Sequence, residues 1–389
     1  MTFVTQIKNL LSVGTLSRHD VNRIAESERI TDKTVQKELT ELAIVLTARE
    51  IALQPLPLQA RFSQIVALYK GQVNLSHRTS QSIMLQQYST PAPIAFMAGE
   101  YVKHGLKNAT KYDVVSYTND KGKKEFQASV KSKENPNEYK TFFSSKSTID
   151  EARKDIAEQV NLYTPSYQIL EPSAGNGLLT VAFPANNVLV NEIDELRNLN
   201  LQGQGYMKVM RVDGTTDLAR LYQFDSLFDG IVTNPPFGTM DKPLVIGEYK
   251  INHLDHVMCI RALDCMKDNG RAAMIIGGHT EYDAKGRVQA GKNRIFLTYL
   301  YSHYNVEDII NIDGSLYSRQ GTSFSVRLIL INGRKAKPQG YPPLKNDNAT
   351  PITDFESLYE RVTLHFSNDK TKRLRLAKAK AKALLLLQV

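Results

Sequence analysis

The chain has 389 residues, of which 42% are hydrophobic and 23% charged, and its formal net charge is +9. This composition is typical of a globular protein of about two or three domains, and it excludes collagen-like, coiled-coil and wholly disordered chains. No window approaches the roughly 18 uncharged apolar residues that a membrane-spanning helix needs. The first residues lack the basic start, apolar run and cleavage site of a secretory signal, so we expect a cytoplasmic protein.

Residues 1–83 are predicted to form an N-terminal helical domain, because apolar residues recur there at three- and four-residue spacing. Asp32 stands just before a strongly periodic stretch and is expected to cap a helix. Residues 17–44 fit either a helix-turn-helix or part of an ordinary helical bundle, and we favour the bundle.

Residues 111–147 change in character. Alternating apolar residues flank the turn signal Asn119-Asp120-Lys121-Gly122, which predicts a β-hairpin-like insertion. An amphipathic helix is expected to follow over residues 148–166. The stretch from Lys103 to Lys146 holds ten lysines against five acids, which suits either a nucleic acid or a solvated face.

From Tyr167 onward, short apolar runs are separated by helical stretches, and the residues 148–335 are predicted to form one core. This alternation predicts an α/β fold, with a parallel sheet that carries helices on both faces. The expected strands are Tyr167–Leu170, Val188–Val190, Lys208–Val212, Gly230–Thr233, Ala272–Ile276, Val306–Ile312 and Ser325–Ile331.

Residues 336–389 are predicted to be a linker with a basic C-terminal tail. Four prolines mark the linker, namely Pro338, Pro342, Pro343 and Pro351. From Asp369 to the end, one acid faces seven basic residues: Lys370, Lys372, Arg373, Arg375, Lys378, Lys380 and Lys382. Such a tail can contact phosphates or simply remain solvated.

The loop from Glu171 to Gly177 directly follows the first predicted strand of the core. Ligands of open parallel sheets bind beyond the carboxyl ends of the strands. Gly175 and Gly177 permit a tight turn and a close approach of a ligand to the backbone. A single Gly-x-Gly is compatible with a dinucleotide site, a nucleoside site or plain packing of strand and helix.

Two acids end the next two predicted strands. Glu192 can accept hydrogen bonds from ribose hydroxyls, and Asp213 can accept one from the exocyclic amine of an adenine. Each acid alone is more often a helix cap or a solvated loop residue. Their repeated spacing of about twenty residues matches the length of a strand–helix unit.

The fourth predicted strand runs directly into Asn234-Pro235-Pro236-Phe237. Two consecutive prolines fix the backbone and remove two hydrogen-bond donors. We expect the Pro235 carbonyl and the Asn234 amide oxygen to form a rigid pair of acceptors for an amine. Phe237 offers a flat face on which a base can stack. A purely structural Pro-Pro turn is the alternative.

Together these motifs resemble the S-adenosylmethionine-dependent amino-methyltransferases, in particular the N6-adenine DNA methyltransferases, over roughly residues 84–333. The resemblance implies a Rossmann-like seven-stranded methyltransferase sheet with S-adenosyl-L-methionine as its cofactor. The loop with Glu171, Ser173, Gly175 and Gly177 would hold the methionine part of the cofactor. Glu192 would bind its ribose and Asp213 its adenine, whereas the target amine would meet the catalytic group Asn234, Pro235, Pro236 and Phe237.

A segment upstream adds to this resemblance. Tyr88, Thr90 and Pro91 match the family's Tyr-x-Thr-Pro cofactor segment, which implies that residues 84–110 close over the cofactor. The order of motifs is similar to that of type I modification subunits and of methylases from phages and mobile elements. The implied partners are duplex DNA with a flipped-out adenine and a separate specificity or restriction subunit, without a membrane or a metal.

Other interpretations remain open. Related families methylate a ribosomal RNA base or a protein glutamine with a similar Asn-Pro-Pro motif, and a non-catalytic DNA-binding subunit would retain the fold. No large target-recognition domain is evident in the sequence. Cys259 and Cys265 are expected to lie on opposite sides of one helix, and therefore not to form a disulfide.

Overall fold

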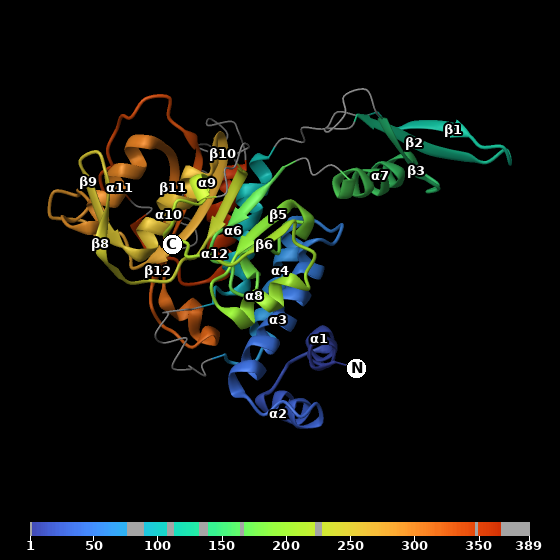
Figure 1. The fold of residues 1–389 in the computed structure, drawn as a ribbon, viewed down its shortest axis with the longest axis horizontal. Coiled ribbons are helices and arrows are strands. Elements are labelled where there is room, and N and C mark those ends of the chain that lie inside the picture. Colours follow the sequence, from blue (N-terminus) through green and yellow to red (C-terminus); the bar gives the residue numbers. More distant parts are fainter. Residues whose placement is uncertain are drawn as a thin grey trace, which may run out of the picture. The chain divides into compact units, whose positions relative to one another are not determined.

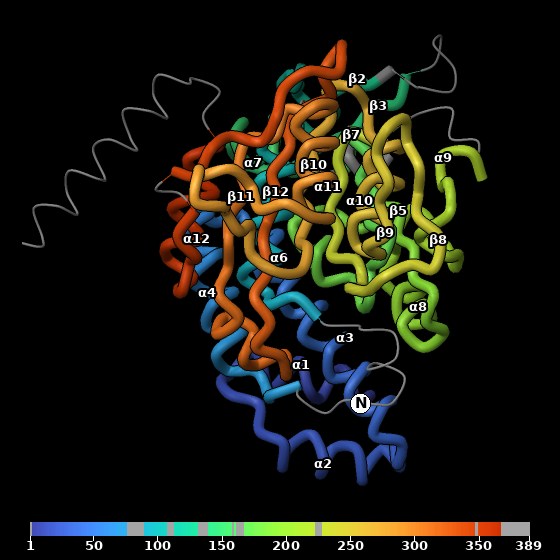
Figure 2. The backbone as a smooth tube through the Cα atoms, turned by 90° about the vertical axis from the view of Figure 1, so that its left-hand side faces the viewer, coloured from blue at the N-terminus to red at the C-terminus, as the bar shows by residue number. Residues whose placement is uncertain are grey.

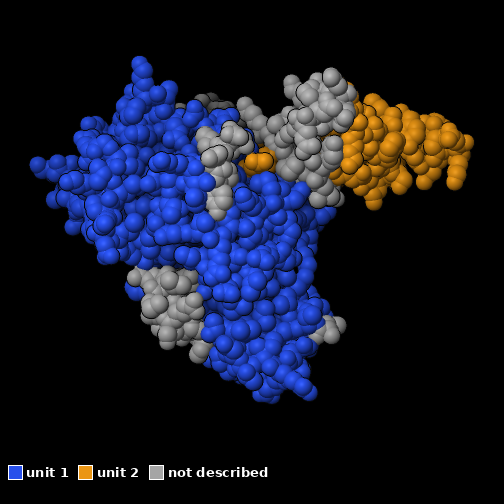
Figure 3. Space-filling model, in the orientation of Figure 1, with its two compact units in different colours: residues 1–105, 169–389 blue, residues 106–168 orange. Residues whose placement is uncertain are grey.

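The computed structural model describes residues 2–75, 89–106, 113–131, 139–163, 167–221, 228–346 and 349–366. The chain divides into two compact units, which are coloured separately in Figure 3. The larger unit comprises residues 1–105 and 169–389, and the smaller unit comprises residues 106–168. Within the described ranges, no helix combines the length and the apolar character that crossing a bilayer requires.

A seven-stranded sheet forms the centre of the larger unit (Figure 1). Its strands are β4 (Ile169–Glu171), β5 (Val188–Asn191), β6 (Lys208–Met210), β7 (Phe228–Thr233), β10 (Met266–Gly277), β11 (Tyr304–Ile312) and β12 (Val326–Arg334). Their order across the sheet is β11-β12-β10-β7-β4-β5-β6. All neighbouring pairs from β10 to β6 are parallel, whereas β12 runs antiparallel to both β10 and β11.

Helices cover both faces of this sheet. The helices α10 (Leu254–Asp264) and α11 (Lys292–His303) share a core with Ile231 of β7. The opposite face meets α6 (Ala92–Gly105), where Gly230 leaves room for Val102. The predicted α/β class with a Rossmann-like seven-stranded sheet is therefore confirmed. The sheet is mixed, however, and not parallel throughout as expected, because β12 runs antiparallel to its two neighbours.

Four helices begin the chain: α1 (Phe3–Val13), α2 (Arg18–Ser27), α3 (Lys33–Ala52) and α4 (Leu58–Gly71). Helices α1 and α2 lie at one end of the larger unit, whereas α4 packs on α6 and α3 (Figure 2). Asp32 caps α3 as predicted, since its carboxylate accepts hydrogen bonds from the backbone N–H groups of Thr34 and Val35. Eleven residues of α3 are buried, including Glu38 and Glu41. This helix therefore packs as part of a bundle and is not an exposed recognition helix.

The smaller unit contains a three-stranded antiparallel sheet and one helix. Its elements are β1 (Val115–Thr118), β2 (Lys124–Lys131), β3 (Tyr139–Ser144) and α7 (Ile149–Tyr163). The predicted turn joins β1 to β2, and Gly122 N donates to Asn119 O at 2.9 Å. The apolar face of α7 packs on Phe126 and Phe142. The helix thus packs with the strands before it in the smaller unit. The sequence analysis had instead placed residues 148 onward in the core.

Other elements lie around the large sheet. A hairpin that the sequence analysis did not predict, β8 (Thr239–Ile246) with β9 (Tyr249–His253), follows Phe237. The short elements are α8 (Glu195–Gln202), α9 (Leu218–Leu221), η1 (Leu178–Thr180), η2 (Ala185–Asn187), η3 (Gly314–Gln320) and η5 (Leu364–Phe366).

Among its described residues, the region predicted to be a linker contains the α-helix α12 (Phe355–Thr363), which packs on α6. Arg361 donates two hydrogen bonds to Asp308 of β11, at 2.6 and 2.7 Å. Helix α12 is therefore fixed to the larger unit by both packing on α6 and an ion pair with β11. The basic residues from Lys370 onward lie outside the described residues.

Candidate functional site

A cavity of about 720 Å³ lies beyond the carboxyl ends of the parallel strands. Its size is within the range of small-molecule sites. Most of the predicted site residues line it, namely Thr90, Ser173, Gly175, Glu192, Asp213, Asn234, Pro235, Pro236 and Phe237. Pro91, Glu171 and Gly177 do not line this cavity, and Tyr88 lies outside the described residues.

Two acids, Glu171 and Glu192, accept hydrogen bonds from the glycine loop after β4. Gly175 adopts a positive φ of 56°, and its N–H donates to Glu192 Oε2 at 2.8 Å. Glu171 is fully buried and accepts hydrogen bonds from the N–H and the hydroxyl of Ser173, at 3.0 and 3.1 Å. Burial raises the pKa of Glu171 to about 8. Glu171 therefore holds Ser173 in place from beneath the cavity.

Residues at the end of β5 form hydrogen bonds to the loops that follow β4, β5 and β6, at the wall of the cavity. Glu192 is 5% exposed, and its second oxygen accepts from Asp194 N at 2.8 Å. Burial raises the pKa of Glu192. Asn191 bonds to the carbonyls of Pro172 and Val212 and to Val212 N, each at 2.9 Å. The sequence analysis missed Asn191, although a polar residue that ends an apolar strand signals such a role.

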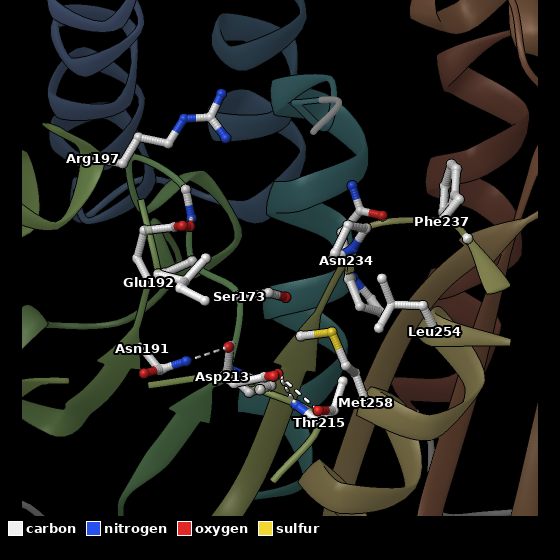
Figure 4. A pocket seen from close by; sticks show the side chains of 18 of the residues that line it. Ser173, Asn191, Glu192, Arg197, Asp213, Thr215, Asn234, Phe237, Leu254 and Met258 are labelled. Carbon is white, nitrogen blue, oxygen red and sulfur yellow. Dashed lines mark hydrogen bonds between the residues drawn. The ribbon is translucent and has the colours of Figure 1, made fainter. Parts of the chain in front are cut away.

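Asp213 is exposed at the edge of the cavity and shapes its own loop. Its Oδ1 accepts from the N–H and the hydroxyl of Thr215, at 2.9 and 2.8 Å (Figure 4). Leu254 and Met258 of α10 bring apolar side chains to the same cavity. A flat apolar group bounded by these side chains would have carboxylate acceptors at its edge.

Asn234 and Phe237 lie on the other side of the cavity from Glu192 and Asp213 (Figure 4). Asn234 Nδ2 donates to Thr90 Oγ1 at 2.9 Å, which fixes the orientation of the amide. Thr90 itself is only 4% exposed. A Cβ placed on Gly277 would lie 3.3 Å from Phe237 Cγ, so the ring rests against the backbone at the end of β10.

A polar cluster lies behind the end of β10, on which the Phe237 ring rests. Asp255 accepts hydrogen bonds from the N–H groups of Gly277 and His256, at 3.3 and 3.1 Å. His253, Asp255 and His256 offer ligand atoms within 4.8 Å of one another. The two imidazole rings stack at 4.9 Å, and burial together with the Arg327 cation lowers the pKa of His256 well below its usual value. Burial therefore favours the neutral form of the His256 ring.

Two further lining residues were missed by the sequence analysis, Glu41 of α3 and Arg197 of α8. Arg197 makes two hydrogen bonds to Glu38, at 2.9 and 3.1 Å. Asn176 of the glycine loop also donates to Glu38, at 2.7 Å. The N-terminal helix α3 is therefore part of the cavity wall. No sequence motif signals this contact, because its partners lie more than 130 positions apart.

Comparisons with known proteins found no matching family model and no matching curated protein. Among solved structures, the chain is similar to a Listeria monocytogenes protein described as a class I S-adenosylmethionine-dependent methyltransferase. The identity is 13% and the TM-score 0.46, with 94% of this chain and 99% of the other covered.

It is also similar to the M protein of the type I restriction enzyme EcoKI, with 12% identity and a TM-score of 0.40 over 93% of this chain and 76% of the other. A structure from a type I restriction-modification system matches with 17% identity and a TM-score of 0.35, over 51% of this chain and 46% of the other. The fold class rests on the strand order of the sheet itself.

Proposed function

We propose that this chain is a methyltransferase that moves a methyl group from S-adenosylmethionine to an exocyclic amine. One observation carries the proposal: Asn234, Pro235 and Phe237 line the same cavity as Gly175 and Glu192. Residues suited to an amine and residues suited to an adenosine therefore share one enclosed space.

The residues present fit this cofactor, which supplies an electrophilic methyl group when bound. Each oxygen of Glu192 accepts one backbone N–H, and a carboxylate oxygen can accept two hydrogen bonds. Glu192 therefore retains capacity for ribose hydroxyls. Asp213 uses Oδ1 for its own loop and can offer Oδ2 to an amine of the base. Leu254 and Met258 can contact the apolar faces of that base.

The chemistry of the amine follows from the acceptors at the end of β7. The lone pair of an exocyclic amine is delocalised into its ring, so the amine is a poor nucleophile. The Asn234 amide oxygen and the Pro235 carbonyl would accept its two N–H groups and direct the lone pair toward the methyl group. Thr90 binds the amide nitrogen of Asn234, which turns the amide oxygen away from Thr90. Holding the reacting groups in line lowers the barrier further.

We further propose that the acceptor is N6 of adenine in duplex DNA. The base must leave the stack, at a cost of a few kcal/mol. Stacking on Phe237 would return roughly 1–3 kcal/mol. The formal net charge of +9 favours a polyanionic substrate. The resemblance to type I modification subunits supports the same choice.

Labelled methyl transfer to three acceptor pools tests this proposal. Purified protein is incubated with methyl-labelled S-adenosylmethionine and unmethylated plasmid DNA, ribosomal RNA or a protein extract. We expect label in the DNA alone, recovered after digestion as N6-methyldeoxyadenosine. Label in RNA or protein would move the acceptor to another amine and retain the enzyme class. Cofactor binding without transfer to any pool would favour a non-catalytic subunit.

A further inference from the structure

One carboxylate in the cavity wall has no role in the chemistry described so far. Glu41 of α3 lines the cavity, yet the residue is only 4% exposed. Its Oε1 accepts a hydrogen bond from the Ser89 hydroxyl at 2.5 Å. Its Oε2 is buried and has no hydrogen-bond partner among the residues that the structure describes. A buried carboxylate oxygen left in this state is costly, unless a ligand satisfies it.

Charges of both signs act on Glu41. They are the Glu38 carboxylate and the cations of Arg197 and Lys37. Arg197 is already engaged, because its Nε and Nη2 both donate to Glu38. Burial and the Glu38 carboxylate raise the pKa of Glu41. Since Glu38 already engages Arg197, the unpartnered oxygen of Glu41 favours a ligand that brings a positive charge and hydrogen-bond donors.

The position of Glu41 indicates which part of a ligand it would meet. Ser89, its partner, is adjacent to Thr90, and Thr90 bonds to Asn234. Glu41 is thus linked to the reactive side of the cavity, away from Asp213. With the adenosine at Glu192 and Asp213 and the methyl group facing Asn234, the amino-acid end of S-adenosylmethionine extends toward this region. That end carries an ammonium group with three N–H donors, whereas the sulfonium has none.

We infer that Glu41 binds the α-ammonium group of the cofactor through its unpartnered Oε2. The inference rests on the proposed function, since it concerns the same cofactor. It makes α3 of the N-terminal helical region a direct contributor to the cofactor site. Ser89 would be a positioning residue that holds the carboxylate from its other oxygen.

The inference is tested by calorimetric binding of two thioethers to purified full-length protein. S-adenosylhomocysteine carries the α-ammonium group, and its des-amino analogue carries hydrogen there. For wild type we expect the des-amino analogue to bind roughly 10- to 100-fold more weakly, as when a charge-assisted hydrogen bond is lost. Glu41→Gln should weaken S-adenosylhomocysteine by a similar factor and leave the des-amino analogue within about twofold of wild type.

Controls separate the possible failures. Glu50 lies on the same helix as Glu41, but it is 64% exposed and pairs with Lys8. The control variant Glu50→Gln should therefore bind both ligands like wild type. Equal affinity of wild type for the two ligands would overturn the inference, as would equal losses for both ligands in Glu41→Gln. Wild type that binds neither S-adenosylmethionine nor S-adenosylhomocysteine would overturn the proposed function itself.

The fold of the variant is checked by thermal unfolding, where Glu41→Gln should melt no lower than wild type because it removes a buried carboxyl. If Glu41→Gln does not fold, Ser89→Ala provides the same comparison with the carboxylate retained. Ser89→Ala should weaken S-adenosylhomocysteine more than the des-amino analogue. Equal weakening of both ligands would contradict a contact between Glu41 and the ammonium.

Discussion

Thr90 connects the upstream segment to the amide that would hold the target amine. Its hydroxyl accepts from Asn234 Nδ2 at 2.9 Å, and its carbonyl accepts from Gln320 Nε2 at 3.4 Å. Losing the hydroxyl would free the amide to rotate, so its oxygen would be misplaced for part of the time. We therefore expect Thr90 to act on the rate of transfer through the orientation of Asn234.

Thr90→Val should lower kcat roughly 10- to 100-fold, the effect of about 1.4–2.7 kcal/mol on the barrier. The dissociation constant for S-adenosylhomocysteine should change little, because the adenosine contacts remain. Thr90→Ser retains the hydroxyl and should recover most of the rate. Steady-state kinetics of the three proteins checks this expectation, and a Thr90→Ser rate as low as that of Thr90→Val would contradict it.

Glu192 and Asp213 should both contribute to cofactor affinity. Glu192→Gln and Asp213→Ala are each expected to weaken binding by roughly 1–3 kcal/mol, the range for hydrogen bonds to charged groups. Titration calorimetry gives both values. Thr215→Val is the matched control, since it removes one loop bond of Asp213 and retains the carboxylate. Two unchanged affinities would exclude these acids from the adenosine site.

Glu171 makes stability depend on pH. Its folded-state pKa is about 8 because of burial, whereas an unfolded glutamate titrates near 4.3. Between these values the folded state retains a proton that the unfolded state releases. The stabilisation from this proton is complete below the unfolded pKa and is lost as the pH rises to about 8.

We therefore expect wild type to lose stability relative to Glu171→Gln between pH 5 and pH 8. The amide oxygen of the variant can still accept from Ser173, so the loop should be retained. Thermal unfolding of both proteins across this range measures the difference. Parallel curves would mean that Glu171 is ionised throughout.

At the level of whole elements, α3 is held by buried polar contacts to η1 and to the region of α8. Arg49 donates to Gln204 Oε1 at 2.9 Å and to Thr180 Oγ1 at 3.1 Å. Nearer the start of α3, Glu38 pairs with Arg197 of α8, and both side chains are 6% exposed. Burial acts against ionisation of Glu38, but Arg197 outweighs it and lowers the pKa of Glu38.

Breaking this pair should destabilise the larger unit strongly. Arg197→Met leaves a buried carboxylate without its cation, which costs about 3–5 kcal/mol. The exposed pair of Lys8 and Glu50 is the matched control, and Lys8→Met should cost less than about 1 kcal/mol. Denaturant unfolding measures both. A loss for Arg197→Met as small as that for Lys8→Met would show that the contact between α3 and α8 is weak.

The elements differ in how far the sequence predicts them. All seven strands of the large sheet were expected, because short apolar runs bounded by loops are a local signal. The hairpin of β8 and β9 was missed. Its strand β8 has exposed or half-buried residues throughout, so no apolar alternation marks it. Helix α7 was predicted as a helix but assigned to the wrong unit, since its packing on β2 and β3 is not visible in its own periodicity.

The residues of the cavity also differ in how far the sequence predicts them. Gly175, Glu192, Asp213 and Asn234 follow strands, so the topology of a parallel sheet brings them together. Glu41 comes from α3, which is far in sequence from the strands of the large sheet. Its place in the wall depends on tertiary contacts of α3, such as those of Glu38 with Asn176 and Arg197 and that of Glu41 with Ser89.

For the molecule as a whole, the concentration of charge in residues 370–389 predicts a general affinity for DNA. Contacts to phosphates carry no sequence information, and each contributes a salt slope near −0.9. Deleting these residues should weaken binding to all DNA sequences about equally and flatten the salt dependence by several units. Any methylated motif should remain the same.

Fluorescence anisotropy at several salt concentrations, with thermal unfolding of the same truncated protein, checks this prediction. Should the tail instead pack on the core, deletion would lower the melting temperature and leave the salt slope unchanged. A truncated protein with both properties unaltered would mean that the tail has neither role.

The most direct test of the proposed methyl transfer is the amount of N6-methyldeoxyadenosine in DNA from methylase-deficient cells that express this chain, measured by mass spectrometry of digested nucleosides. Asn234→Ala is the comparison, because its side chain would hold the target amine without anchoring the sheet. We predict the modified nucleoside with wild type, at least a tenfold smaller amount with Asn234→Ala, and similar S-adenosylhomocysteine affinity and melting temperature for both purified proteins. Equal amounts of the modified nucleoside with the two proteins, above the level of cells without either, would contradict the assignment of Asn234.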